Sequence, residues 1–130
     1  MNKSNGGEVK KVLIIDDEPE IREIIEDIVS EMGYFCIMAD SLITSIGIFE
    51  CNKIDIAFFD VSLNADHASE LGVANGIDLL MYVRKKNFSG KAICVSGFAN
   101  ILENDPNLKK FDVVIQKPFK EDDIIRSLIM

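Results

Sequence analysis

The sequence contains few cysteines and no long apolar runs, and each shortage argues against a class of protein. Cys36, Cys51 and Cys94 show no CxxC spacing and lie in apolar segments. Such cysteines indicate reduced core thiols rather than a disulfide framework or a metal site. No apolar run approaches the about 20 residues that span a membrane, and the N-terminus lacks the apolar core of a signal peptide. We therefore expect a cytoplasmic protein without a membrane partner.

Basic residues are also in short supply, with 14 lysines and arginines against 22 acidic residues and a net charge of -8. Binding to a phosphate backbone needs the opposite balance, so we expect no direct nucleic-acid partner. The content of 48% hydrophobic and 28% charged residues is typical of a folded chain. Its 130 residues suit one domain, and the polar residues 1–11 are predicted to form a flexible leader.

Short apolar runs alternate with segments of helical periodicity along the rest of the chain. The predicted strands cover residues 12–15, 35–38, 54–59, 91–96 and 112–116, and the predicted helices begin near residues 19, 41, 76 and 121. Residues 97–111 have apolar positions at helical spacing, but Pro106 should interrupt a helix there. This alternation predicts an α/β domain in which helices cover both faces of a parallel sheet. The pattern leaves the order of the strands open.

Polar side chains stand where the predicted strands end. Asp16 and Asp17 follow the first strand, and Asp60 follows the third. Ser96 ends the fourth strand, and Lys117 follows the fifth. The carboxyl ends of parallel strands share one edge of the sheet, where ligands bind. Carboxylates gathered there would need a cation between them, and oxygen ligands beside a phosphate suit Mg²⁺. The edge therefore predicts a carboxylate that is placed to accept a phosphoryl group.

Each of these residues also has an ordinary structural interpretation. Asp16 and Asp17 could cap the following helix, and Asp60 could be a turn former. Ser96, which precedes a glycine, is more often a turn residue than a ligand, and a single lysine is usually solvated. Their joint occurrence at the ends of four strands favours a functional cleft.

Four segments carry a family resemblance: Val12-Leu13-Ile14-Ile15-Asp16-Asp17-Glu18-Pro19, Phe58-Phe59-Asp60, Val95-Ser96-Gly97 and Gln116-Lys117-Pro118-Phe119. Together they resemble the receiver domain of two-component response regulators, of the chemotaxis-response-regulator kind, over about residues 11–129. The resemblance implies a three-layer, flavodoxin-like (βα)5 fold with a parallel sheet of order 2-1-3-4-5. It assigns residues 12–130 to a receiver domain.

The resemblance also implies a metal site. Asp17 and Asp60 would bind Mg²⁺, or Mn²⁺ in its place, directly, and Asp16 would act mainly through water. The backbone carbonyl of Ser62 would complete the protein ligands.

Asp60 would then take a phosphoryl group from a sensor histidine kinase or a phosphotransfer protein, which would alter the binding of an unknown downstream protein. Ser96 and Lys117 would contact the phosphoryl group, and the Lys117–Pro118 peptide bond would be cis. A domain of this kind is not an enzyme in the usual sense, because it catalyses only its own phosphorylation and dephosphorylation.

Three features depart from the family pattern. The connection between Asp60 and Gly76 is longer than usual, and its extra residues 64–75 contain the single histidine, His67, for which a solvated loop position is favoured over a functional one. Val114 takes the place of the usual aromatic switch residue. The turn before the fifth strand is unusual as well, so the output partner cannot be inferred from relatives.

Two alternative functions stay open. A pseudo-receiver would bind partners without being phosphorylated; the three acids and Lys117 argue against this function, whereas Val114 favours it. An aspartate-nucleophile phosphohydrolase would also use Mg²⁺ and an aspartate at a strand end. Those enzymes carry an Asp-x-Asp motif, however, and Ser62 occupies its second acidic position here.

Overall fold

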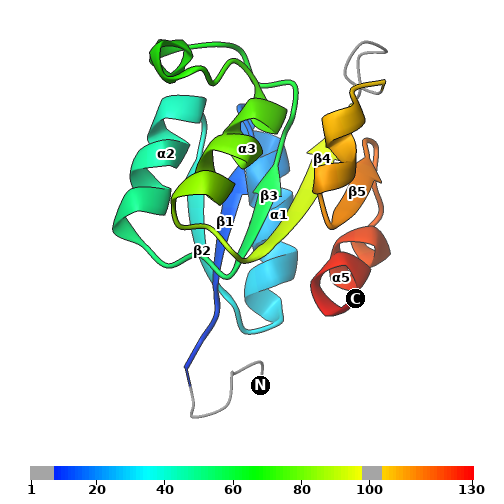
Figure 1. The fold of residues 1–130 in the computed structure, drawn as a ribbon. Helices are drawn as coiled ribbons and strands as arrows, with labels where there is room; N and C mark the ends of the chain where they lie inside the picture. Colours follow the sequence, from blue (N-terminus) through cyan, green and yellow to red (C-terminus); the bar gives the residue numbers. More distant parts are fainter. Residues whose placement is uncertain (1–7, 98–103) are drawn as a thin grey trace.

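Five parallel strands form one sheet in the order β2-β1-β3-β4-β5 within the residues that the structure describes, 8–97 and 104–130 (Figure 1). The computed structural model places β1 at Lys11–Ile15, β2 at Phe35–Ala39, β3 at Ile56–Phe59, β4 at Lys91–Ser96 and β5 at Val113–Gln116. The α-helices are α1 (Pro19–Glu31), α2 (Leu42–Cys51), α3 (Gly76–Lys86) and α5 (Glu121–Ile129), and the 3-10 helices are η1 (His67–Leu71) and η2 (Pro106–Lys110). The strand order confirms the flavodoxin-like arrangement.

Helices α1 and α5 cover one face of the sheet, and α2 and α3 cover the other (Figure 1). Strand β3 lies at the centre, and all its residues are buried. Because side chains alternate along a strand, Phe58 joins the core under α1 and α5, and Phe59 joins the core under α2 and α3. The Phe59 ring stacks on Phe49 of α2, with centroids 6.0 Å apart. Burial on both faces explains the uninterrupted apolar sequence of this strand.

The predicted strand boundaries are correct to within two residues, and the differences have local causes. β3 begins at Ile56 rather than at residue 54, because the carboxylate of Asp55 accepts a hydrogen bond from the Lys11 backbone N–H at 2.8 Å. Lys11 belongs to β1 and not to the predicted leader, of which residues 1–7 lie outside the described residues. In the segment 97–111, residues 98–103 also lie outside them. Pro106 begins η2, as proline can at a first helical position.

The three cysteines occupy different environments. Cys94 in β4 is fully buried, and burial raises the pKa of its thiol to about 12. Cys36 is partly buried, and desolvation raises its pKa to about 11. Cys51 is exposed at the last residue of α2, so the prediction that it lies in the core was wrong. None of the described helices has the length and apolar character needed to cross a membrane.

Candidate metal centre

The sheet brings the predicted side chains to one edge. The backbone N–H of Asp60 donates to the carbonyl of Ile15 at 3.0 Å, and that of Lys117 donates to the carbonyl of Ser96 at 2.9 Å. The hydrogen-bonded ladder thus continues one residue beyond β3 and β5. Both residues are therefore fixed by backbone bonds at the edge of a rigid sheet, as a functional site requires.

Three carboxylates lie together at this edge. One ligand oxygen from each of Asp16, Asp17 and Asp60 lies within 4.8 Å of the other two. Asp16 and Asp60 are buried, with 2% and 3% of their surfaces exposed, whereas Asp17 is exposed. Hard carboxylate oxygens that are partly open to solvent suit a hydrated divalent cation such as Mg²⁺ or Ca²⁺. The donor set therefore fits a divalent metal site.

Lys117 supplies positive charge to the same edge. Its Nζ lies 2.9 Å from Asp16 Oδ2, 3.5 Å from Asp60 Oδ2 and 3.7 Å from Glu18 Oε2. Burial disfavours the ammonium form, but the hydrogen bond to Asp16 and the nearby acidic residues outweigh burial and raise the pKa of Lys117. This side chain stays charged at neutral pH and neutralises part of the acidic cluster.

The two adjacent aspartates have different surroundings. The carboxylate of Asp16 accepts from Lys117 Nζ and, at 2.9 Å, from the backbone N–H of Glu18, and its carbonyl accepts from Arg22 Nη1 at 2.7 Å. Desolvation nevertheless raises the pKa of Asp16. No hydrogen bond or ion pair joins the side chain of Asp17 to another residue in the described part of the chain. The protein thus leaves the Asp17 carboxylate available to a ligand. The contacts of Glu18 and Arg22 with Asp16 were not predicted from the sequence, because no local pattern marks them.

Asp60 and Ser96 complete the edge. Asp60 Oδ1 accepts from the backbone N–H of Ser62 at 3.0 Å and from Ser62 Oγ at 2.7 Å. The family resemblance implied a role only for the Ser62 carbonyl, and that role as a metal ligand stays a prediction. Ser96 is fully buried, and its Oγ has no hydrogen-bond partner among the described residues. A buried hydroxyl without a partner is costly, so the Ser96 hydroxyl is available to a ligand at this edge.

The long connection after Asp60, residues 62–75, includes η1. Through η1 it packs against α2 (Figure 1). Leu63, Ala68 and Val73 are buried in the core under α2 and α3. Asp66 fixes the connection, because its carboxylate accepts from the backbone N–H groups of Ala68 at 2.8 Å and of Ile43 in α2 at 3.1 Å. The side chain of His67 is 89% exposed, which agrees with a solvated loop histidine.

Replacing Asp66 with alanine is expected to lower the free energy of unfolding by about 1–2 kcal/mol, because two helix N-termini lose a capping carboxylate. Urea denaturation followed by circular dichroism measures the change. Glu70→Ala is the matched control, since it removes the same charge from an exposed position in η1. Equal stability of the two variants would show that Asp66 does not anchor the connection.

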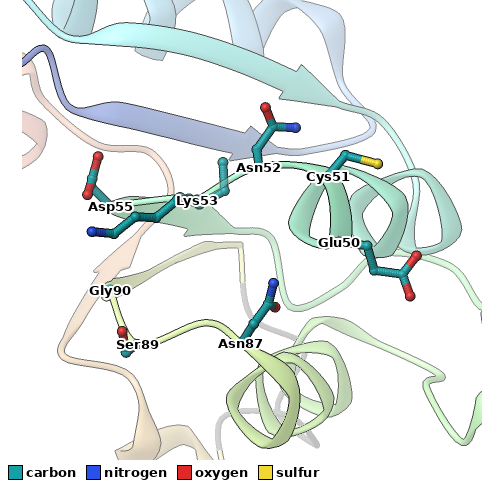
Figure 2. Close-up of a pocket in the computed structure, with 9 residues that line it drawn as sticks. Glu50, Cys51, Asn52, Lys53, Asp55, Asn87, Ser89 and Gly90 are labelled. Carbon is teal, nitrogen blue, oxygen red and sulfur yellow. The ribbon is translucent and has the colours of Figure 1, made fainter.

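A separate cavity opens at the opposite edge of the sheet, where α2 and α3 end (Figure 2). It has a volume of about 640 Å³ and includes Asn52, Asp55, Asn87 and Gly90 in its lining. Asn87 donates to the carbonyl of Phe49 at 3.0 Å and so closes the C-terminus of α2. None of the predicted site residues lines this cavity, so the candidate metal centre is separate from it.

Comparison with known proteins decides the family. A sequence model described as the response regulator receiver domain matches residues 12–129. The chain belongs to this family. It is the receiver domain of a two-component system. The Lys117–Pro118 peptide bond of this receiver is cis, as the resemblance implied. Val114, which departs from the family pattern at the usual aromatic position, is 46% exposed in β5.

Individual relatives agree with the assignment. The nitrogen assimilation regulatory protein NtrX of Azorhizobium caulinodans is 24% identical over 116 residues, which are 88% of this chain and 24% of that protein. The chain thus spans about a quarter of the length of this curated relative. A CheY-like receiver domain protein from Methanospirillum hungatei has a TM-score of 0.79 and 26% identity, with 93% of this chain and 91% of that one covered.

The response regulator TrrA of Thermotoga maritima was solved in complex with Mg²⁺ and BeF. It has a TM-score of 0.78 and 22% identity, and the match covers 93% of this chain and 97% of TrrA. TrrA was also solved in complex with the histidine kinase ThkA. At this identity, the likeness to TrrA shows the fold alone.

Proposed function

We propose that Asp60 is the phosphoacceptor of this receiver and that Mg²⁺, for which Mn²⁺ can substitute, is its cofactor. The observation that carries the proposal is the buried Asp60 carboxylate, which lies in reach of two other carboxylates and 3.5 Å from the Lys117 ammonium. Asp17 and Asp60 would hold the metal directly, with the Ser62 carbonyl, and Asp16 would act through water. The Mg²⁺ and BeF complex of TrrA supports this choice of metal.

The reaction transfers a phosphoryl group from a phosphohistidine to Asp60. A carboxylate oxygen of Asp60 forms a bond to phosphorus while the bond between phosphorus and the histidine nitrogen breaks, and the nitrogen keeps the electron pair. The bound cation would neutralise charge on the phosphoryl oxygens. Lys117 stays protonated and offers its ammonium group to the same oxygens, and Ser96 offers its unpaired hydroxyl. Placement and charge neutralisation supply most of the catalysis in such transfers.

The proposed donor is a sensor histidine kinase or a phosphotransfer protein in the cytoplasm. The complex between TrrA and ThkA supports a kinase as the partner. The downstream partner is a protein whose binding changes with phosphorylation, and the net charge of -8 argues against direct binding of nucleic acid. The domain catalyses only its own phosphorylation and dephosphorylation.

Incubation with Mg²⁺ and acetyl phosphate is expected to give a protein whose intact mass increases by one phosphoryl group. The Asp60→Asn variant should give no adduct, because an amide oxygen is a poor nucleophile and the metal loses a charged ligand. Continuous release of inorganic phosphate at a rate typical of an enzyme would favour the phosphohydrolase. A wild-type protein that neither forms an adduct nor binds Mg²⁺ would be a pseudo-receiver.

A further inference from the structure

We infer that Gly76 is a positioning residue for Asp60, and this inference rests on the proposed function of Asp60. Gly76 is the first residue of α3, and it is buried. A Cβ atom at Gly76 would lie 2.5 Å from the backbone oxygen of Asp60 and 2.6 Å from Cα of Val61. Only a residue without a side chain lets α3 begin against the peptide that follows the phosphoacceptor.

A backbone hydrogen bond also joins Gly76 to the next peptide of the chain, between Val61 and Ser62. The backbone N–H of Gly76 donates to the carbonyl of Val61 at 3.2 Å. This bond joins the two ends of the 62–75 connection, so the position of the Asp60 peptide does not depend on the conformation of that long segment. It depends on α3, whose side chains Ile77, Leu79 and Leu80 are buried in the core.

Position 76 has no space for a side chain unless the surrounding backbone moves. Any larger residue at position 76 must push α3 or the Asp60 peptide aside by about half an ångström, which is as much as a functional constellation can absorb. Because Asp60 is fixed on its other side by the hydrogen bond to Ile15, the displacement would turn its carboxylate relative to Asp17. The distance between two metal ligands would change although no ligand is removed.

The chain offers a matched control at the opposite edge of the sheet. A Cβ atom at Gly90 would collide with the backbone oxygen of Asp55. Gly90 lines the cavity away from the acidic cluster (Figure 2). Gly76→Ala and Gly90→Ala therefore introduce the same methyl group against a backbone carbonyl, and both should destabilise the fold. Only Gly76→Ala should disturb the metal centre.

The experiment measures Mn²⁺ affinity by electron paramagnetic resonance, because the chain has no tryptophan to report binding by fluorescence. Formation of the beryllofluoride adduct is followed in parallel by ¹⁹F NMR, at a temperature where circular dichroism shows folded protein. We expect Gly76→Ala to bind Mn²⁺ about tenfold to a hundredfold more weakly than wild type and Gly90→Ala to bind like wild type. Equal affinity in the two variants would overturn the inference. A wild-type protein without Mn²⁺ binding or adduct would instead refute the proposed function.

A second pair of variants decides the matter if Gly76→Ala does not fold. Asn75 caps α3 by accepting from the Asp78 backbone N–H at 2.9 Å, and Ser41 caps α2 by accepting from the Thr44 backbone N–H at 3.2 Å. Asn75→Ala and Ser41→Ala each remove one helix cap. If α3 positions Asp60, Asn75→Ala weakens Mn²⁺ binding severalfold and Ser41→Ala does not. Unchanged affinity in both would overturn the inference.

Discussion

Replacing Lys117 with methionine is expected to destabilise the protein by about 3 kcal/mol at pH 7 in the absence of divalent metal. The substitution leaves two buried carboxylates, Asp16 and Asp60, without the ammonium group that now lies 2.9 and 3.5 Å from them. The same variant should bind Mg²⁺ more tightly, by about tenfold, because a competing cation is gone. It should respond poorly to phosphorylation, since the phosphoryl group loses its cationic partner.

The loss of stability should depend on pH. The folded-state pKa of Lys117 is raised, so its stabilising contribution is fully present below its ordinary value of 10.5 and is lost as the pH rises through the folded value. The pKa of Asp16 is already raised by burial, and it rises further when the hydrogen bond from Lys117 is removed. An acid with a raised folded pKa favours folding at low pH. The stability deficit of the variant should therefore shrink as the pH falls from 7 toward 3.8, the ordinary pKa of an aspartate.

Urea denaturation of wild type and Lys117→Met, with and without Mg²⁺, measures these effects. The measurements run from about pH 4, which is near the ordinary pKa of aspartate, to about pH 8. Lys85→Met is the control, since Lys85 is an exposed lysine in the last turn of α3. Added Mg²⁺ should restore part of the lost stability, because a ligand that binds only the folded state stabilises it. A deficit that is the same at every pH, or weaker Mg²⁺ binding, would contradict the electrostatic role of Lys117.

Replacing Asp17 with asparagine is expected to lower Mg²⁺ affinity by about a hundredfold and to prevent efficient phosphorylation. Asp17 is the exposed carboxylate of the cluster, and its side chain has no bonded partner among the described residues. The folded state therefore loses no hydrogen bond on substitution. One of three neighbouring negative charges disappears, so the metal-free variant should be at least as stable as wild type. Loss of metal binding without loss of stability distinguishes a ligand from a structural acid.

Isothermal titration calorimetry with Mg²⁺ and thermal denaturation of the metal-free protein test the two halves of this prediction. Asp40→Asn is the matched control, because Asp40 follows β2 at the same edge of the sheet and is exposed. The control should bind Mg²⁺ like wild type. If Asp17→Asn and Asp40→Asn have the same affinity, general acidity of the edge binds the cation and Asp17 is not a specific ligand.

Local patterns predicted the elements better than they predicted their environments. β3 was found because burial on both faces requires consecutive apolar residues, and that requirement is visible in the sequence. The connection after Asp60 was predicted only as a loop, although Leu63, Ala68 and Val73 lie in the core. Their spacing follows neither the helical nor the strand period, so no periodic pattern marks them as buried. The same limit applies to Cys51, whose apolar neighbours wrongly suggested a core position.

The residues of the candidate site were likewise predicted better than their contacts. Asp16 and Asp17 are adjacent aspartates in the sequence, and the family resemblance implied a direct metal ligand for Asp17 and a water-mediated role for Asp16, both of which stay predictions. Their contacts were not visible in the sequence: Asp16 is hydrogen-bonded to Lys117, a residue 101 positions away, whereas the side chain of Asp17 has no bonded partner among the described residues. Gly76 was predicted only as the residue that precedes a helix. Its contact with the Asp60 peptide exists because α3 packs against the end of β3, and no local pattern shows that packing.

The sequence alone determined the alternation of strands and helices, the polar residues at the strand ends and, through its motifs, membership of the receiver family. These features are set by residue order and periodicity, which act over a few positions. Only the tertiary structure decided which acid is hydrogen-bonded to the lysine, which acid has no partner among the described residues, where the long connection packs and why a Cβ atom at position 76 would collide with the backbone. Those outcomes depend on distances between residues far apart in the chain, and the packed sheet and helices fix these distances.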